Sequence, residues 1–154
     1  MARVLKPPTR VDLSPGARSV FLAGSIDMGQ AEDWQSTVTR ALGDRDVVIL
    51  NPRRDEWDAS WEQDIAFAPF REQVEWELEG LERATIIAVY FAPTSKAPVT
   101  LLELGLFAKS DRVVVCCPEG YWRRGNVEII CRRYEVQMAA DLDALVREIR
   151  RRLD

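Results

Sequence analysis

Apolar positions along the chain follow two alternating patterns. Continuous apolar runs at residues 19–23, 47–50, 85–91 and 112–117 predict short buried strands. Between them, apolar side chains recur every three or four residues over 31–42, 67–83 and 100–109, and again toward the C-terminus, which predicts amphipathic helices. A short helix near 126–131 and an edge strand at 134–136 complete the pattern. Alternating strands and helices of this kind indicate an α/β fold whose parallel sheet is covered on both faces.

We therefore expect a doubly wound, three-layer sandwich with five mainly parallel strands. Residues 1–18 contain Pro7, Pro8 and Pro15 and no sustained period, so they are predicted to be an N-terminal tail, and residues 19–154 the folded domain. Ligands of such sheets bind outside the carboxyl ends of the strands, at the topological switch point. Two of these ends are Gly24-Ser25 and Asn51-Pro52.

Composition excludes several classes of chemistry. The 154 residues contain no histidine, which excludes Ser-His-Asp hydrolysis and histidine-bound zinc, so carboxylates are the first candidates for proton transfer. The 21 basic and 25 acidic residues give a net charge of −4, which argues against nucleic acid as a partner. Three cysteines without CxxC spacing indicate neither disulfides nor a metal site. With no signal-peptide pattern and no membrane-length apolar run, we expect a cytoplasmic protein that does not bind membranes.

Glu103 is the most unusual carboxylate, because it lies in the apolar segment Leu101-Leu-Glu-Leu-Gly-Leu-Phe107. Apolar surroundings raise a carboxyl pKa and suit a nucleophile or acid in glycosyl transfer. Thr100-x-x-Glu103 also matches a capping box, in which the glutamate would only bond to the start of its own helix. The sequence leaves both interpretations open.

Two further segments are candidates for ligand contact. The loop Asn51-Pro-Arg-Arg-Asp-Glu-Trp-Asp58 combines amide, guanidinium, indole and carboxylate groups at a strand end, a mixture suited to a planar heterocycle, with Trp57 and Asp58 as candidate base contacts. A salt-bridged surface loop is the alternative. Glu77 lies in a run of acids on a predicted helix, where most carboxylates are solvated.

Four segments together resemble the nucleoside 2-deoxyribosyltransferase family, in particular its "like" branch. They are Val20-Phe-Leu-Ala-Gly-Ser25, Asn51-Pro-Arg-Arg54, Glu77-Leu-Glu-Gly80 and Leu102-Glu-Leu-Gly-Leu-Phe-Ala108. The Glu-Leu-Gly element and Gly-Asn-Val-Glu128 after Cys-Pro118 are the most specific parts. The resemblance implies a flavodoxin-like fold and exchange of the base of a 2′-deoxynucleoside with a free nucleobase, without cofactor or metal.

The resemblance also implies roles for individual residues. Glu103 matches the glutamate that forms the covalent deoxyribosyl intermediate, and Glu77 the carboxylate that handles the proton of the base. Four further residues are expected to contact the substrate: Gly24, Ser25, Asn51 and Arg53. Asn126 matches an asparagine that reaches the sugar in a neighbouring subunit, which implies a homo-oligomer with shared sites.

Two positions depart from the family pattern. Ala97 stands about six residues before Glu103, where the family places an acid that holds the sugar, and Phe21 replaces a tyrosine that orients the nucleophile. Phenylalanine cannot donate a hydrogen bond, so Glu103 must be oriented by other groups.

Two alternatives share this fold. A 2′-deoxynucleoside 5′-phosphate N-hydrolase would send the same intermediate to water, with Arg53, Arg54 and Arg71 as candidate phosphate contacts. A non-catalytic nucleotide sensor would bind without turnover, but two acids facing a neutral sugar argue against it.

Overall fold

The computed structural model describes residues 1–26, 32–55, 58 and 60–154. Within these residues, one sheet contains the strands β1 (Arg3–Leu5), β2 (Ser19–Gly24), β3 (Val48–Leu50), β4 (Ile86–Tyr90), β5 (Val113–Cys116) and β6 (Gln137–Ala139). The helices are α1 (Trp34–Ala41), α2 (Ala68–Arg83), α3 (Pro98–Phe107), α4 (Arg124–Arg133) and α5 (Leu142–Leu153), with a short 3-10 helix at Ala108–Ser110. The predicted alternation of strands and helices is confirmed.

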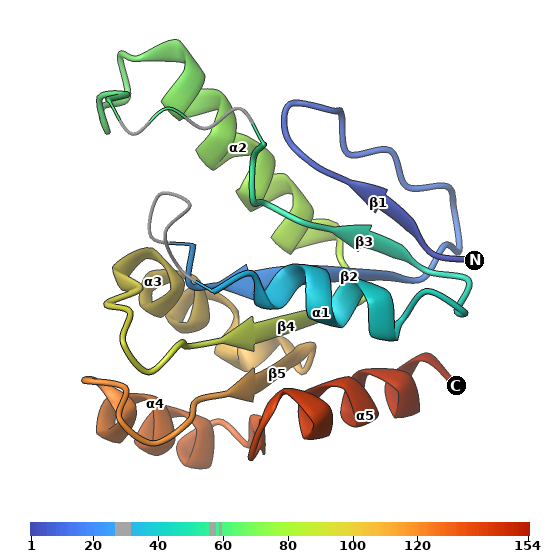
Figure 1. The fold of residues 1–154 in the computed structure, drawn as a ribbon, viewed down its shortest axis with the longest axis vertical. Coiled ribbons are helices and arrows are strands. Elements are labelled where there is room, and N and C mark those ends of the chain that lie inside the picture. Colours follow the sequence, from blue (N-terminus) through green and yellow to red (C-terminus); the bar gives the residue numbers. More distant parts are fainter. Residues whose placement is uncertain (27–31, 56–57, 59) are drawn as a thin grey trace.

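The helices form two layers around the sheet (Figure 1). Helices α1 and α5 cover one face, where Trp34 and Leu145 pack on Leu22 and other buried side chains of the strands. Helices α2, α3 and α4 cover the opposite face, which includes Phe21 and Val89. Successive strand residues point to opposite faces, so strands buried on both sides are apolar throughout, which explains the continuous apolar runs.

The sheet is parallel throughout and has the order β1-β3-β2-β4-β5-β6. The fold is therefore the expected three-layer α/β sandwich, but the prediction of five strands is wrong, because the sheet has six. The additional strand is β1, which pairs with β3 from Arg3↔Val48 to Leu5↔Leu50. Three residues, separated by only Lys6 from a proline pair, are too few to show a period-2 pattern in the sequence.

The first residues pack against the fold beyond β1 as well. The indole Nε1 of Trp76 on α2 donates to the Thr9 carbonyl at 2.7 Å, and Arg83 Nη1 donates to the Val11 carbonyl at 2.9 Å. Leu5 and Val11 are buried in the main core cluster. The acceptors in both hydrogen bonds are backbone carbonyls, so the pattern of side chains along the sequence could not predict them.

The last strand lies three residues later than predicted, at Gln137–Ala139 instead of 134–136. Helix α4 continues to Arg133, and Glu135 has a positive φ of 55°, so residues 134–136 form the turn that ends the helix. Among the described residues, no helix is both long enough and apolar enough to cross a membrane.

The chain reverses its direction across the sheet between β2 and β4. Strand β2 pairs with β3 on one side and with β4 on the other. The connection from β2 through α1 leads to β3, toward one edge of the sheet, whereas the connection from β4 through α3 leads to β5, toward the other edge. The carboxyl ends of these strands meet at this switch point, where ligands of parallel sheets bind.

Candidate active site

The Gly24-Ser25 turn lies at the carboxyl end of β2 and is tightly enclosed. A Cβ atom on Gly24 would lie 2.4 Å from the Tyr90 carbonyl oxygen and 2.6 Å from the Trp34 ring, so only glycine fits. The Ser25 amide donates to the same carbonyl at 3.1 Å, and the Ser25 hydroxyl accepts from the Ala92 amide at 3.0 Å. Among the described residues, no acceptor for the Ser25 hydroxyl proton is found.

Asn51 and Arg53 shape the end of β3. The buried Asn51 side chain accepts from the Arg53 amide at 3.0 Å, which forms a turn. The Arg53 guanidinium reaches α1, where its Nη1 donates to Gln35 Oε1 at 3.3 Å and lies 3.8 Å from Asp33. The two side chains thus join the strand end to α1, and a substrate contact by either stays a prediction.

Glu77 lies on α2 and is only partly exposed, so it differs from the solvated acids around it. One turn earlier, the buried Gln73 side chain donates to Glu77 Oε2 at 3.4 Å and to the Pro52 carbonyl at 2.9 Å. The interpretation of Glu77 as a solvated surface acid is therefore not supported.

Glu103 lies on the inner side of α3 and is 8% exposed. The helix starts at Pro98 with Ala97 at its cap position, so Thr100 is already inside the helix. The capping-box interpretation of Thr100 and Glu103 is thus wrong. The prediction failed because the helix begins at Pro98, two residues before the start at residue 100 that the sequence pattern suggested.

The two glutamates influence each other electrically. Burial raises the pKa of Glu103 above its ordinary value. Burial also raises the pKa of Glu77, the negative charge of Glu103 raises it further, and the hydrogen bond from Gln73 opposes this rise. Because a negative charge on Glu103 disfavours a second charge on Glu77, the two carboxyl groups favour a form in which the pair holds a single proton. One acid and one nucleophile is the division of roles that glycosyl transfer requires.

The loop after Asn51 is only partly described. Trp57 lies outside the described residues, so its predicted base contact stays a prediction. Asp58 is exposed and accepts from the Ser60 hydroxyl at 2.7 Å and from the Ser60 amide at 2.9 Å, which lower its pKa. The Arg54 guanidinium lies 4.9 Å above the Trp61 ring, and its Nε and Nη1 atoms are buried without a hydrogen-bond partner in the described chain.

The two departures from the family pattern are accommodated within the fold. Phe21 is fully buried, with its ring centroid 6.1 Å from that of Trp76. Ala97 is buried in a left-handed conformation with a φ of 44°. The preceding Lys96 carbonyl accepts from the Tyr121 hydroxyl at 2.7 Å and from the Trp122 indole at 3.0 Å, which holds this loop in place.

Asn126 is exposed on α4, in a shallow cavity of about 460 Å³ between α3 and α4. Within the described residues, no contact joins Asn126 to Glu77 or Glu103. Its predicted role across a subunit boundary stays a prediction.

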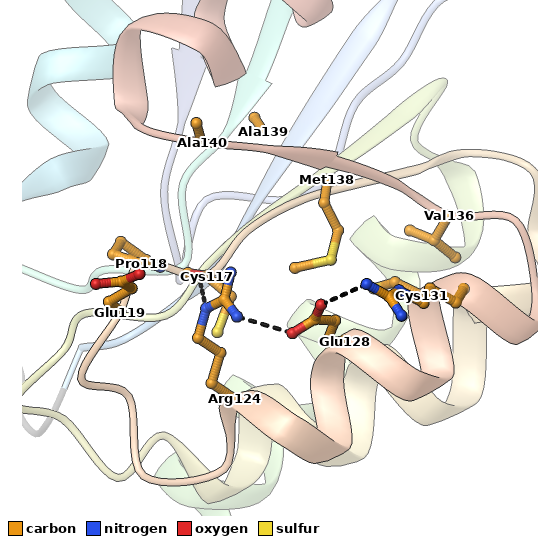
Figure 2. A pocket seen from close by; sticks show the side chains of 11 residues that line it. Cys117, Pro118, Glu119, Arg124, Glu128, Cys131, Val136, Met138, Ala139 and Ala140 are labelled. Atoms are coloured by element: carbon orange, nitrogen blue, oxygen red, sulfur yellow. Dashed lines mark hydrogen bonds and ion pairs between the residues drawn. The ribbon is translucent and has the colours of Figure 1, made fainter.

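A different cavity of about 640 Å³ lies between α4 and the ends of β5 and β6 (Figure 2). Its two arginines pair with Glu128, which accepts from Arg124 at 2.8 Å and from Arg132 at 2.9 Å, and the exposed Glu119 also lines the cavity. Burial raises the pKa of the Cys117 thiol to about 11 and likewise that of Cys131 to about 11, so both are protonated. Protonated thiols are poor nucleophiles, so these cysteines give the cavity no evident chemistry.

Sequence reasoning did not identify Gln73 as a site residue. Its spacing of four from Glu77, which places both on one helix face, was the available signal. Side-chain patterning could not show that the loop end at Pro52 lies over this face.

Comparisons with known proteins agree with this architecture. Residues 17–121 match the family model described as "Nucleoside 2-deoxyribosyltransferase like", a range that includes Glu77 and Glu103 but not Asn126. The chain is also similar to a conserved protein from Enterococcus faecalis V583, with 13% identity, a TM-score of 0.60, and coverage of 88% of this chain and 99% of that one. At this identity the likeness concerns the fold alone.

A search of curated proteins finds no match. The family model covers more than half of the chain, and the protein therefore belongs to the nucleoside 2-deoxyribosyltransferase-like family.

Proposed function

We propose that the protein transfers 2-deoxyribose between nucleobases through a covalent deoxyribosyl intermediate on Glu103. The observation that carries this proposal is the pair of sheltered carboxyl groups on α2 and α3, of which the charge of one raises the pKa of the other. Paired carboxyl groups with separated roles are the equipment of retaining glycosyl transfer.

In the first step, a carboxylate oxygen of Glu103 forms a bond to C1′ of the deoxyribose. The bond between C1′ and the base nitrogen breaks, and its electron pair leaves with the base. Glu77 donates its proton to a ring nitrogen of the departing base, which neutralises the developing charge. The transition state has oxocarbenium character, which favours a sugar without an electron-withdrawing 2′-hydroxyl.

In the second step, a ring nitrogen of another base attacks C1′ from the vacated side. The bond between C1′ and Glu103 breaks, and its electron pair returns to the carboxylate. The proton displaced from the incoming base passes to Glu77, which restores the starting state. Two inversions at C1′ give net retention of configuration.

The substrate contacts belong to the same proposal. Ser25 supplies a hydroxyl proton at the switch point, and Gly24 allows the chain to turn there. Asn51, Arg53, Trp57 and Asp58 are the proposed contacts around the base. No step in this scheme calls for a metal or an organic cofactor.

Arg54 supports a second candidate function. Its guanidinium has two buried N–H groups without a partner in the described chain, and guanidinium groups bind phosphate well. A 2′-deoxynucleoside 5′-phosphate would satisfy them, with water replacing the second base. The protein would then be an N-hydrolase that uses the same two glutamates.

A second copy of the chain is the proposed partner. The outer side of α3 exposes Val99, Leu102 and Leu106, and Trp122 and Ile129 extend this apolar surface toward α4. Asn126 lies in the cavity between the same helices. An interface here would bring Asn126 of one copy toward a neighbouring site.

The test uses wild type, Glu103→Ala and Glu82→Ala, the last being an exposed acid at the far end of α2. Each is incubated with 2′-deoxynucleosides or their 5′-phosphates, with and without a different free base, and the products are separated by chromatography. A new nucleoside formed by wild type and Glu82→Ala, but lost in a folded Glu103→Ala, supports the transferase.

Other outcomes decide against it. Release of base without exchange, above all from the 5′-phosphates, would support the N-hydrolase. Binding of these compounds without turnover would support the nucleotide sensor. Full activity of Glu103→Ala would remove the proposed intermediate.

A further inference from the structure

Gln73 carries an unpaired acceptor beside the proton-donating glutamate. The residue is 6% exposed, and its Nε2 donates to the Pro52 carbonyl at 2.9 Å and to Glu77 Oε2 at 3.4 Å. Its other polar atom, Oε1, is buried and accepts no hydrogen bond within the described chain. Buried polar atoms are normally paired, so a buried acceptor without a donor calls for an explanation.

The orientation of this amide is determined by its neighbour. Rotating the amide by half a turn would place Oε1 against the Pro52 carbonyl oxygen, and neither atom carries a proton to share. The unpaired atom is therefore the carbonyl oxygen. A ligand with a hydrogen-bond donor at this position would pair with it.

Gln73 and Glu77 together present a defined pattern to a base. A protonated Glu77 donates, and the Gln73 carbonyl oxygen beside it accepts. The complementary edge has a ring nitrogen that accepts next to an exocyclic amino group that donates. Adenine presents this edge through N7 and its 6-amino group, and cytosine through N3 and its 4-amino group, whereas their oxo counterparts place an acceptor where the amino group would be.

The same arrangement connects recognition to catalysis. The ring nitrogen that meets Glu77 is the one that takes up the proton as the base departs. A base held by Gln73 is thus aligned for protonation.

We propose that Gln73 selects amino-substituted bases over their oxo counterparts by accepting a hydrogen bond from the exocyclic amino group. This inference rests on the proposed glycosyl chemistry at Glu103 and names the substrate class of that site. It assigns base selection to α2 in addition to the loop after Asn51.

The test compares three purine 2′-deoxynucleosides that differ only at position 6: the amino compound, the unsubstituted compound and the oxo compound. Initial rates of base release are measured with one acceptor base held constant. For wild type we expect kcat/KM to be at least about tenfold higher for the amino than for the unsubstituted compound, and lowest for the oxo compound. Gln73→Met removes the acceptor but keeps a side chain of similar length. In this variant, kcat/KM for the amino compound should exceed kcat/KM for the unsubstituted compound by no more than about threefold.

Gln137→Met, at an exposed position on β6, is the matched control and should keep the wild-type ratio. Thermal melting establishes whether each variant folds. If Gln73→Met does not fold, the order of the three substrates on wild type decides the question, and an oxo compound as good as the amino compound overturns the proposal.

The outcomes separate this inference from the proposed function. Base release with a ratio unchanged in folded Gln73→Met overturns the role of Gln73 and leaves the glycosyl chemistry intact. If wild type releases base neither from the three nucleosides nor from their 5′-phosphates, both proposals are overturned.

Discussion

Glu77 and Glu103 both lie in sheltered surroundings. Both lose contact with water on folding, and the charge of Glu103 disfavours a second charge on Glu77. Protons therefore leave the pair in two steps that belong to the pair and not to either residue alone. In the proposed mechanism, the singly protonated pair is the form that attacks C1′ and protonates the base.

The first prediction concerns the pH dependence of activity. We expect kcat/KM to follow a bell shape, with an acidic limb where the pair gains a second proton and an alkaline limb where it loses the last one. Since both pKa values are raised, the maximum should lie above the range in which exposed carboxyl groups titrate. Rates from pH 4 to 10 check this, and a plateau that begins below about pH 4.5 would contradict it.

The second prediction concerns the stability of Glu77→Gln. A carboxyl whose pKa is raised by folding contributes stability below its unfolded pKa, and this contribution is lost as the pH rises through the folded pKa. Wild type should lose this stability toward alkaline pH, whereas the amide should not. Near pH 4.5 we expect wild type and Glu77→Gln to have equal Tm values. At pH 9 the Tm of Glu77→Gln should be higher than that of wild type, by about 2–4 °C for each kcal/mol of stability that wild type has lost.

Glu72→Gln serves as the control, because Glu72 is exposed on the same helix. Melting of the three proteins at pH 4.5, 7 and 9 makes the comparison. A Glu77→Gln protein that is less stable than wild type at pH 9 would show that the carboxylate is stabilised by a partner and not penalised by burial.

At the scale of elements, α2 approaches the sheet closely enough to bring Glu77 inward. A Cβ atom on Gly80 would lie 2.8 Å from two ring atoms of Phe21, which is fully buried. The small residue thus allows the helix to pack against β2, about one turn after Glu77.

The third prediction compares two glycine variants. Gly80→Ala should destabilise the protein, because overpacking costs about 1–3 kcal/mol and the gain in helix propensity is only about 1 kcal/mol. Gly105→Ala on α3 meets no atom within 4 Å, so it should stabilise the protein by up to about 1 kcal/mol. Urea unfolding measures both. Equal stability of the two variants would show that α2 can shift away from Phe21 without cost.

At the scale of the whole molecule, the first residues belong to the fold. Leu5 is 8% exposed beside β3, whereas its neighbour Val4 is 39% exposed. The fourth prediction is that Leu5→Ala destabilises the protein by about 2–5 kcal/mol, as truncation of a buried leucine does elsewhere. Val4→Ala should cost less than about 1 kcal/mol. If urea unfolding gives the same small cost for both, residues 1–18 act as a tail.

The fifth prediction concerns assembly. Leu102 is 65% exposed on α3, so Leu102→Asp should fold normally and weaken self-association, which sedimentation velocity measures. Activity should fall in parallel if Asn126 completes a neighbouring site, and Asn126→Ala should lower activity without changing the size of the assembly. Ile65→Asp, an exposed apolar position in the loop before α2, is the control. A wild-type monomer with full activity would contradict this prediction.

The sequence determined the alternation of elements, because helices and buried strands impose different periods on apolar residues. The apolar runs at residues 19–23, 85–91 and 112–117 predicted their strands in this way, and the apolar neighbours of Glu103 indicated that its side chain is buried. Local patterning could not show β1, the turn at Glu135 or the start of α3 at Pro98, since backbone pairing and helix ends decide these.

Tertiary structure alone decided the relation between Glu77 and Glu103. They are 26 residues apart in the chain, and no pattern within either helix distinguishes Glu77 from the exposed acids beside it. The packing of α2 and α3 on one face of the sheet shelters the two together and makes each sensitive to the other's charge. The same packing turned Gln73 from one polar helix residue among many into a buried acceptor next to the acid, because burial and electrostatic coupling depend on distances in space and not on spacing in sequence.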